Sequence, residues 1–184
     1  MSEHEYYISI DVETAGPHPG RYALLAIGAC AISNPSDSFY IELQPDREDN
    51  QPEALQVSGL DLSDLKVHGQ PPGAAMQAFA DWLAAIIPAG HRAVFVAFNA
   101  PFDWAFVNEY FQRYLGHNPF GHSALDIKAY FMGLKGLAWS ETSMKAATQS
   151  YFGERPLTHH ALQDALDQAE LFRKMLEEAR TKNE

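Results

Sequence analysis

The chain has 184 residues, of which 46% are hydrophobic and 12% aromatic, and this composition excludes an intrinsically disordered protein. No apolar stretch reaches the roughly 18 residues that a membrane span needs, and the polar start MSEHE does not resemble a signal peptide. The single cysteine excludes an intrachain disulfide framework. We therefore expect one domain over residues 1–184, located in the reducing cytoplasm and not in a membrane.

The net charge is −11, from 13 Lys and Arg against 24 Asp and Glu. A protein that holds long nucleic acid duplexes neutralises many phosphates with basic residues, so this charge has the wrong sign for that class. Three Trp, eight Tyr and eleven Phe supply a large apolar core for a domain of this length. The composition is typical of a compact enzyme.

The first predicted strand covers residues 7–12, within the run YYISIDVETAG. The apolar run ends in two acids spaced two apart, Asp11 and Glu13. Residues two apart on a strand face the same side, so both carboxylates point one way. Further strands are predicted at residues 24–33 and 39–43, separated by the turn clusters PHPGRY and NPSDS. An acid pair at a strand end can also be no more than a solvated terminus.

The middle of the chain is predicted as helix, strand and helix. Residues 71–87 carry apolar side chains at helical spacing, and residues 93–98 form an apolar run suited to a buried strand. This run breaks at Asn99 and restarts as a helix that continues to about residue 114 and carries Asp103 in its first turn. An acid in a first turn can instead serve only the helix dipole.

The last third of the chain is predicted to hold a short strand at residues 124–127 and helices that begin near residues 129, 140 and 160. In the segment LTHHALQDALDQAELF, Asp164 lies on a strong amphipathic pattern, and His159 precedes it at the helix entry. The pair His159 and His160 could be an ordinary helix entry or half of a zinc site. Zinc normally takes further His or Cys ligands at regular spacing, and Cys30 has no partner motif, so the sequence disfavours zinc. Strands that alternate with helices predict an α/β fold with a mixed sheet flanked by helices.

Acidic side chains thus occur at the ends of two predicted strands and at one helix entry. In an open α/β sheet, these positions surround the crevice in which ligands bind. Carboxylates with one histidine and no thiol suit hard cations such as Mg²⁺ or Mn²⁺. The sequence predicts a metal-dependent catalytic site built from Asp11, Glu13, Asp103, His159 and Asp164.

Three segments, DVETAG, NAPFD and HHALQD, occur in this order along the chain. They resemble the three motifs of the DEDD-type 3'-to-5' exonucleases, in the histidine subclass (DEDDh) that includes ribonuclease T and the epsilon exonuclease of DNA polymerase III. The resemblance extends from Tyr6 to Phe172 and implies a ribonuclease-H-like fold with a five-stranded sheet. Two positions depart from the family: Ala15 stands where threonine or methionine is common, and Phe98 where histidine is common.

By this resemblance, the chain is a phosphodiester hydrolase that uses two Mg²⁺ or Mn²⁺ ions per site. The resemblance implies that Asp11 bridges both ions, that Glu13 and Asp164 complete one ion site, and that Asp103 holds the other. It also implies that His159, five residues before Asp164, deprotonates the attacking water. The expected product is a nucleoside 5'-monophosphate released from a free 3' end.

The resemblance and the local sequence also predict contacts with the substrate. Gly16 lets the backbone approach a terminal sugar. Phe102 can stack on a terminal base, although an aromatic ring in this sequence can equally belong to the core. Ser58 lies in VSGL, which resembles a segment that the family places beside the substrate, although a helix C-cap with Gly59 explains it as well. The predicted substrate contacts are Thr14, Ala15, Gly16, Ser58, Asn99 and Phe102.

The expected substrate is a single-stranded 3' end of DNA or RNA, because the net charge disfavours tracking of a duplex. Two alternatives stay open: a proofreading or repair subunit docked on a polymerase or helicase, and a non-cleaving nucleic-acid-binding adapter of the same fold. A homodimer is a further expectation, because a second copy can supply the basic residues that one cleft lacks. Candidate phosphate contacts within the chain are Arg21, Lys128, Lys135 and Lys145.

Overall fold

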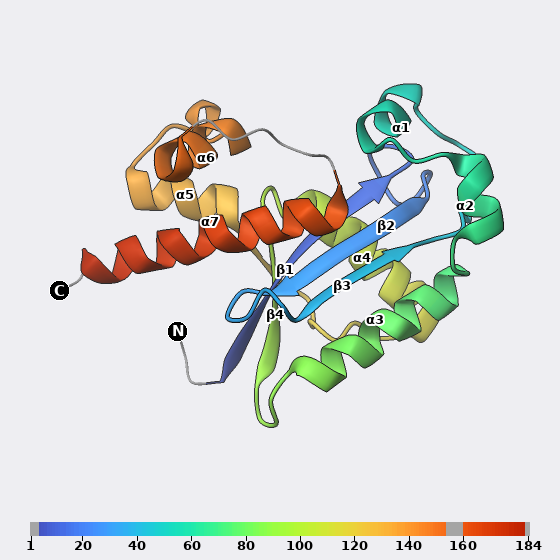
Figure 1. Cartoon of the computed structure of the whole chain (residues 1–184), viewed down its shortest axis with the longest axis horizontal. Helices are drawn as coiled ribbons and strands as arrows, with labels where there is room; N and C mark the ends of the chain where they lie inside the picture. Colours follow the sequence, from blue (N-terminus) through green and yellow to red (C-terminus); the bar gives the residue numbers. More distant parts are fainter. Residues whose placement is uncertain (1–3, 154–159, 183–184) are drawn as a thin grey trace.

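The computed structural model describes residues 4–153 and 160–182 of the chain (Figure 1). Within these residues, five strands form one mixed sheet in the order β3-β2-β1-β4-β5. β2 is antiparallel to both β1 and β3, whereas β4 is parallel to both β1 and β5. The strands are β1 (Glu5–Thr14), β2 (Leu24–Ala31), β3 (Ser38–Glu42), β4 (Arg92–Ala97) and β5 (Ala124–Asp126).

Helices cover both faces of this sheet, which confirms the predicted architecture. α7 crosses one face with α5 and α6 beside it, and α3 and α4 pack on the other (Figure 1). In the part of the chain that the structure describes, none of the helices is long and apolar enough to cross a membrane. The helices are α1 (Pro52–Ser58), α2 (Leu62–His68), α3 (Pro72–Ile86), α4 (Pro101–Leu115), α5 (Ile127–Lys135), the 3-10 turn η1 (Trp139–Glu141), α6 (Met144–Phe152) and α7 (Ala161–Thr181).

The side chains of β1 alternate between the two layers. Ile8, Ile10 and Val12 are buried in the core that α3 and α4 share with the sheet. Asp11 and Glu13 lie on the opposite face, because successive residues of a strand point to opposite sides. The strand thus anchors itself through one face and presents both acids on the face that α7 covers.

Some element boundaries differ from the sequence prediction, for local reasons. β4 ends at Ala97, because the backbone N–H of Phe98 donates to the side-chain Oε1 of Gln168 and not to a neighbouring strand. α5 begins at Ile127, because the Asp126 carboxylate accepts from the backbone N–H of Lys128 and caps the helix. α1 ends at the helix C-cap that the sequence offered at Gly59, and α2 is additional to the predicted elements. Both helices pack against the end of the sheet around β1 and β2.

Candidate active site

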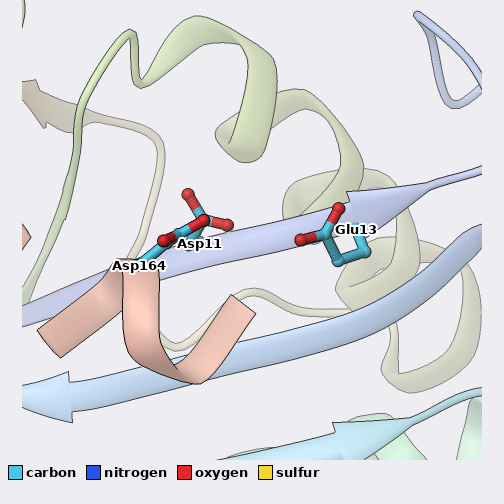
Figure 2. Close-up of side chains that lie close together, drawn as sticks. All are labelled: Asp11, Glu13 and Asp164. Atoms are coloured by element: carbon cyan, nitrogen blue, oxygen red, sulfur yellow. The ribbon is translucent and has the colours of Figure 1, made fainter. Parts of the chain in front are cut away.

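Three carboxylates meet at the surface where α7 begins. Asp11 and Glu13 rise from β1, and Asp164 reaches them from the first turn of α7 (Figure 2). One oxygen of each residue lies within 4.8 Å of an oxygen of the other two, and all three side chains are partly exposed. Carboxylate oxygen atoms at this spacing match the ligand set that Mg²⁺, Mn²⁺ and Ca²⁺ prefer.

Asp164 reaches β1 because α7 lies unusually close to the sheet. Gly28 of β2 is paired with Asp11 across the β1 and β2 ladder. A Cβ atom at Gly28 would lie 2.1 Å from the carbonyl carbon of Ala161 and 2.2 Å from the backbone nitrogen of Leu162. Only glycine admits the first turn of α7 at this distance, so Gly28 sets how near Asp164 comes to Asp11.

Asp103 lies beside this group and is held differently. It stands in the first turn of α4, is only 4% exposed, and accepts a 3.1 Å hydrogen bond at Oδ1 from the backbone N–H of Val12. Val12 is the residue between Asp11 and Glu13, so this bond fixes α4 against the strand that carries both acids. The structure thus brings three predicted acids close together, with Asp103 near enough for its charge to raise the pKa of Asp11.

The turn that leads to Asp103 has a support that the sequence reasoning missed. Asn99 has a left-handed backbone with φ 64, which asparagine tolerates better than most residues. Oδ1 of Asp126 accepts hydrogen bonds from the backbone N–H groups of Asn99 and Ala100, at 2.9 and 3.3 Å. The available signal was an acid at the end of the predicted strand 124–127, where a helix begins.

Gln168 is a second residue that the sequence reasoning missed. It is 3% exposed, lies one helical turn after Asp164 on α7, and contacts Asp11. Its Nε2 donates to Oδ1 of Asp11 at 2.7 Å. The available signal was its position four residues after Asp164, on the same face of an amphipathic helix.

The electrostatics of the group favour a bound cation. Burial, and then the negative charges of Asp103, Asp164 and Glu13, raise the pKa of Asp11 well above its usual range. The hydrogen bond from Gln168 lowers this pKa, but by less. Burial, and then the charge of Asp164, raises the pKa of Glu13 to about 7. Burial raises the pKa of Asp103 to about 8, although the bond from Val12 opposes this. A divalent cation would replace these protons, so the donor set fits a metal ion.

These shifts predict how stability without metal depends on pH. The pKa values of Glu13 and Asp103 in the folded protein lie above their ordinary 4.5 and 3.8, so the folded state holds protons that the unfolded chain releases. The melting temperature in chelator should therefore fall as pH rises from about 5 to about 8 and then level off. Added Mg²⁺ should reduce this slope, as measured by thermal denaturation at each pH. A melting temperature in chelator that rises over this range would contradict the burial of these acids.

The predicted general base, His159, lies outside the described residues. Its neighbour His160 is described, and it occupies the N-cap position of α7. The His160 ring stacks on Tyr40 of β3, with ring centres 4.8 Å apart. The His160 ring therefore packs against β3 of the sheet at the start of α7.

A pocket of about 380 Å³ adjoins the acids, and three of the six predicted substrate contacts line it. The hydroxyl of Thr14 donates to the carbonyl oxygen of Gly16 at 2.9 Å, which shapes the turn after Glu13. Glu13 lines the pocket as well, so the pocket opens onto the Glu13 carboxylate. The lining residues are Val12, Glu13, Thr14, Gly16, Pro17, Gln51, Glu53, Ala54, Val57 and Phe102.

The other three predicted contacts do not line this pocket. Ala15 is fully buried. The hydroxyl of Ser58 donates to the carbonyl of Leu55 at the end of α1, and Gly59 follows in a left-handed conformation. Asn99 is exposed at the turn before α4. Contacts of these three residues with a substrate stay predictions.

Two of the candidate phosphate contacts already have acidic partners. Arg21 pairs with Asp49 at 2.6 Å, and Lys135 pairs with Glu178 at 2.7 Å. Lys128 lies 4.1 Å from the centre of a tryptophan ring. The cations of Arg21 and Lys135 are therefore partly neutralised within the chain, which reinforces the shortage of free positive charge.

Comparisons with known proteins agree with this geometry. Residues 8–172 match the RNase_T family, described as exonuclease. The 3'-5' DNA exonuclease Cap18 of Escherichia coli is 45% identical over 172 residues, which cover 94% of this chain and 92% of that protein. Ribonuclease T of Yersinia pseudotuberculosis is 32% identical over 180 residues, which cover 91% of this chain and 82% of that protein.

Solved structures share the fold at low sequence identity. The nuclease domain of 3'hExo, a DEDDh family member bound to rAMP, superposes with a TM-score of 0.79 at 14% identity, and covers 96% of this chain and 94% of its own. Escherichia coli exonuclease I in complex with a dA16 oligonucleotide gives a TM-score of 0.74 at 16% identity, over 98% of this chain and 42% of that one. The predicted ribonuclease-H-like fold and the resemblance to DEDDh exonucleases are confirmed. With three carboxylates converging at the expected positions and a family match over most of its length, this chain belongs to the RNase_T family of exonucleases.

Proposed function

We propose that this protein removes nucleotides one at a time from the 3' ends of single-stranded DNA, in a reaction that requires divalent cations. The observation that carries the proposal is the convergence of Asp11, Glu13 and Asp164 within 4.8 Å, beside a pocket that opens to solvent. The match to a DNA exonuclease at 45% identity, against 32% for a ribonuclease, favours DNA over RNA.

The chemistry assigns a role to each acid. Asp11, Glu13 and Asp164 would hold Mg²⁺ or Mn²⁺, two ions per site, with Asp103 contributing from α4. Bound divalent cations supply an activated water and stabilise charge on the attacking and leaving oxygens at phosphorus. His159 would take the proton from that water, so that each cycle releases a nucleoside 5'-monophosphate.

The pocket beside Glu13 is suited to the terminal nucleotide. Phe102 is partly buried and lines it from α4, and Val57 lines it from α1 with 54% of its surface exposed. Stacking of a base on an aromatic ring contributes about 1 to 3 kcal/mol and does not depend strongly on the base. A terminal base between Phe102 and Val57 would place the scissile phosphodiester, on the 5' side of the terminal nucleotide, near Glu13.

A non-cleaving adapter is the weaker hypothesis. An adapter does not need several acids that repel one another, since their raised pKa values show that the ionised cluster is costly without a cation. A catalytic site needs that same cluster to bind metal. The geometry therefore favours cleavage.

The experiment that tests this function uses four oligonucleotides, single-stranded and blunt duplex, of DNA and of RNA, each labelled at the 5' end. With Mg²⁺, single-stranded DNA should shorten progressively from the 3' end on a sizing gel, faster than RNA and faster than duplex DNA. The same DNA strand with a blocked 3' terminus should stay intact. Release of the 5' label as the first product would contradict the proposed polarity.

The third motif gives a prediction about its two histidines. His159→Ala should slow single-turnover cleavage by about 100-fold or more, because general-base catalysis contributes that much, with Mg²⁺ binding retained. His160→Ala should cost far less, because its ring packs on Tyr40. The cleavage rates of the two variants, measured at saturating Mg²⁺, decide which histidine is the general base. If His160→Ala proves the slower variant, the general base is His160.

We also propose a homodimer, because the basic residues of one chain are few and partly ion-paired. Arg21 and Lys135 pair with acids of the same chain, so a second copy is a source of further phosphate contacts. Sedimentation at micromolar concentration tests this proposal. A monomer with full activity would contradict it.

A further inference from the structure

One buried amide connects β1, which carries Asp11 and Glu13, with the residue that follows β4. Gln168 is 3% exposed and lies on α7, which packs against β1 and β2. Its Nε2 donates to Oδ1 of Asp11 at 2.7 Å, and its Oε1 accepts from the backbone N–H of Phe98 at 2.8 Å. A single side chain thus connects an acid on β1 with the residue that follows the end of β4.

The two bonds fix the orientation of this amide. A carboxylate accepts hydrogen bonds and a backbone N–H donates one, so a flipped amide would lose both bonds. The amide therefore has one satisfied orientation, and in it Oδ1 of Asp11 is tied to a fixed donor. That bond restricts rotation of the Asp11 carboxylate.

The second hydrogen bond, from the backbone N–H of Phe98 to Gln168, holds the segment that leads into α4 and Asp103. Phe98 precedes Asn99, whose left-handed turn leads into α4. Because the N–H of Phe98 is bonded to Gln168 and the N–H of Asn99 to Asp126, consecutive backbone groups of this turn are held by side chains. Gln168 thus links the placement of Asp11 to that of the turn before Asp103.

We propose that Gln168 is a positioning residue for cation binding: it holds the Asp11 carboxylate in the orientation that receives the cation, and it ties that carboxylate to the end of β4. This inference rests on the proposed function. Partners of metal ligands act in this way, and their loss typically weakens metal affinity or activity about 10- to 100-fold.

Two variants separate this role from a merely structural one. Gln168→Met keeps the length of the side chain and removes both hydrogen bonds. Gln168→Glu keeps an acceptor for the N–H of Phe98 and removes the donor to Asp11. Gln77→Met is the matched control, because Gln77 donates at 2.8 Å to Asp81 on the exposed face of α3.

The measurement is a Mg²⁺ titration of each variant, followed by thermal shift without substrate and by cleavage of a labelled single strand. Gln168→Met and Gln168→Glu should each raise the Mg²⁺ concentration for the half-maximal thermal shift about 10-fold or more, with activity recovering in excess Mg²⁺. Gln77→Met should match the wild type. The KM for the oligonucleotide at saturating Mg²⁺ should stay unchanged.

Loss of activity that excess Mg²⁺ does not restore, with an unchanged Mg²⁺ midpoint, would overturn the proposal and leave Gln168 a structural residue. If Gln168→Met does not fold, Gln168→Glu decides in the same way. The wild-type protein distinguishes failure of the proposed function from failure of the proposal for Gln168. A wild-type protein that shows neither a Mg²⁺-induced shift nor cleavage removes the proposed function itself, and a wild type that shows both leaves the result to the variants.

Discussion

Asp11→Asn should abolish measurable cleavage, with a loss of about 1,000-fold or more, since removal of one electrostatic stabiliser of a transition state already costs on the order of 100- to 1,000-fold. Asp103→Asn should have a similar effect. The amide removes the negative charge that a cation needs while it keeps the shape of the side chain. Single-turnover cleavage of a labelled single strand at saturating Mg²⁺ gives the rate.

The same substitution should leave the folded state intact and stabilise it in chelator. Burial and three neighbouring acids raise the pKa of Asp11, so its ionised form is unfavourable without a cation. The melting temperature of Asp11→Asn in chelator near pH 8 should exceed that of the wild type, and Mg²⁺ should raise it less. Asp81→Asn, at an exposed position on α3, is the matched control and should change neither quantity. An Asp11→Asn protein that melts earlier in chelator and cleaves in proportion to its folded fraction would make Asp11 a structural residue.

Gly28→Ala should reduce kcat/KM by about 100-fold, because a displacement of about 1 Å at a catalytic group can cost that much. The new Cβ would lie 2.1 Å from the backbone of Ala161, and backbone at that distance cannot yield by a side-chain rotation. The start of α7 must therefore move away from β2. Asp164, three residues further along, moves with it and away from Asp11. Steady-state kinetics on the single-stranded substrate give this quantity.

The control for this change is Gly133→Ala. Gly133 lies in α5, and among the described residues a Cβ atom there would meet nothing within 4 Å beyond its own helix. Alanine at this position should therefore be neutral or slightly stabilising, as expected in a helix. The Gly28→Ala protein should also need more Mg²⁺ for its half-maximal thermal shift. Unchanged kcat/KM in Gly28→Ala would show that the close approach of α7 to β2 does not set the geometry of the acids.

Local patterns in the sequence predicted the strands and the direction of the first two acids. The alternation around Asp11 and Glu13 requires only that the segment is a strand with one buried face, and β1 fulfils this through Ile8 and Ile10. The convergence of Asp164 on this pair needed more than local pattern. It came from the order of the motifs and their resemblance to a known family.

The supports of the site were beyond local reasoning, because each acts through a contact between distant parts of the chain. From the sequence alone, Gly28 is an ordinary glycine in a strand. Only the structure shows that the backbone of Ala161 lies against it. From the sequence alone, Gln168 is a polar residue on a helix. Its hydrogen-bond partners Asp11 and Phe98 are far from it along the chain. The sequence offers no periodicity from which such pairings follow.

Cation dependence tests the central claim most directly. The wild-type protein is incubated with 5'-labelled single-stranded DNA in excess chelator, and Mg²⁺ or Mn²⁺ is then added above the chelator concentration. The acids around Asp11 predict an intact strand before the addition, and afterwards progressive shortening from the 3' end with release of nucleoside 5'-monophosphates. Full-rate shortening in excess chelator would contradict the account, as would an intact strand in the presence of both cations.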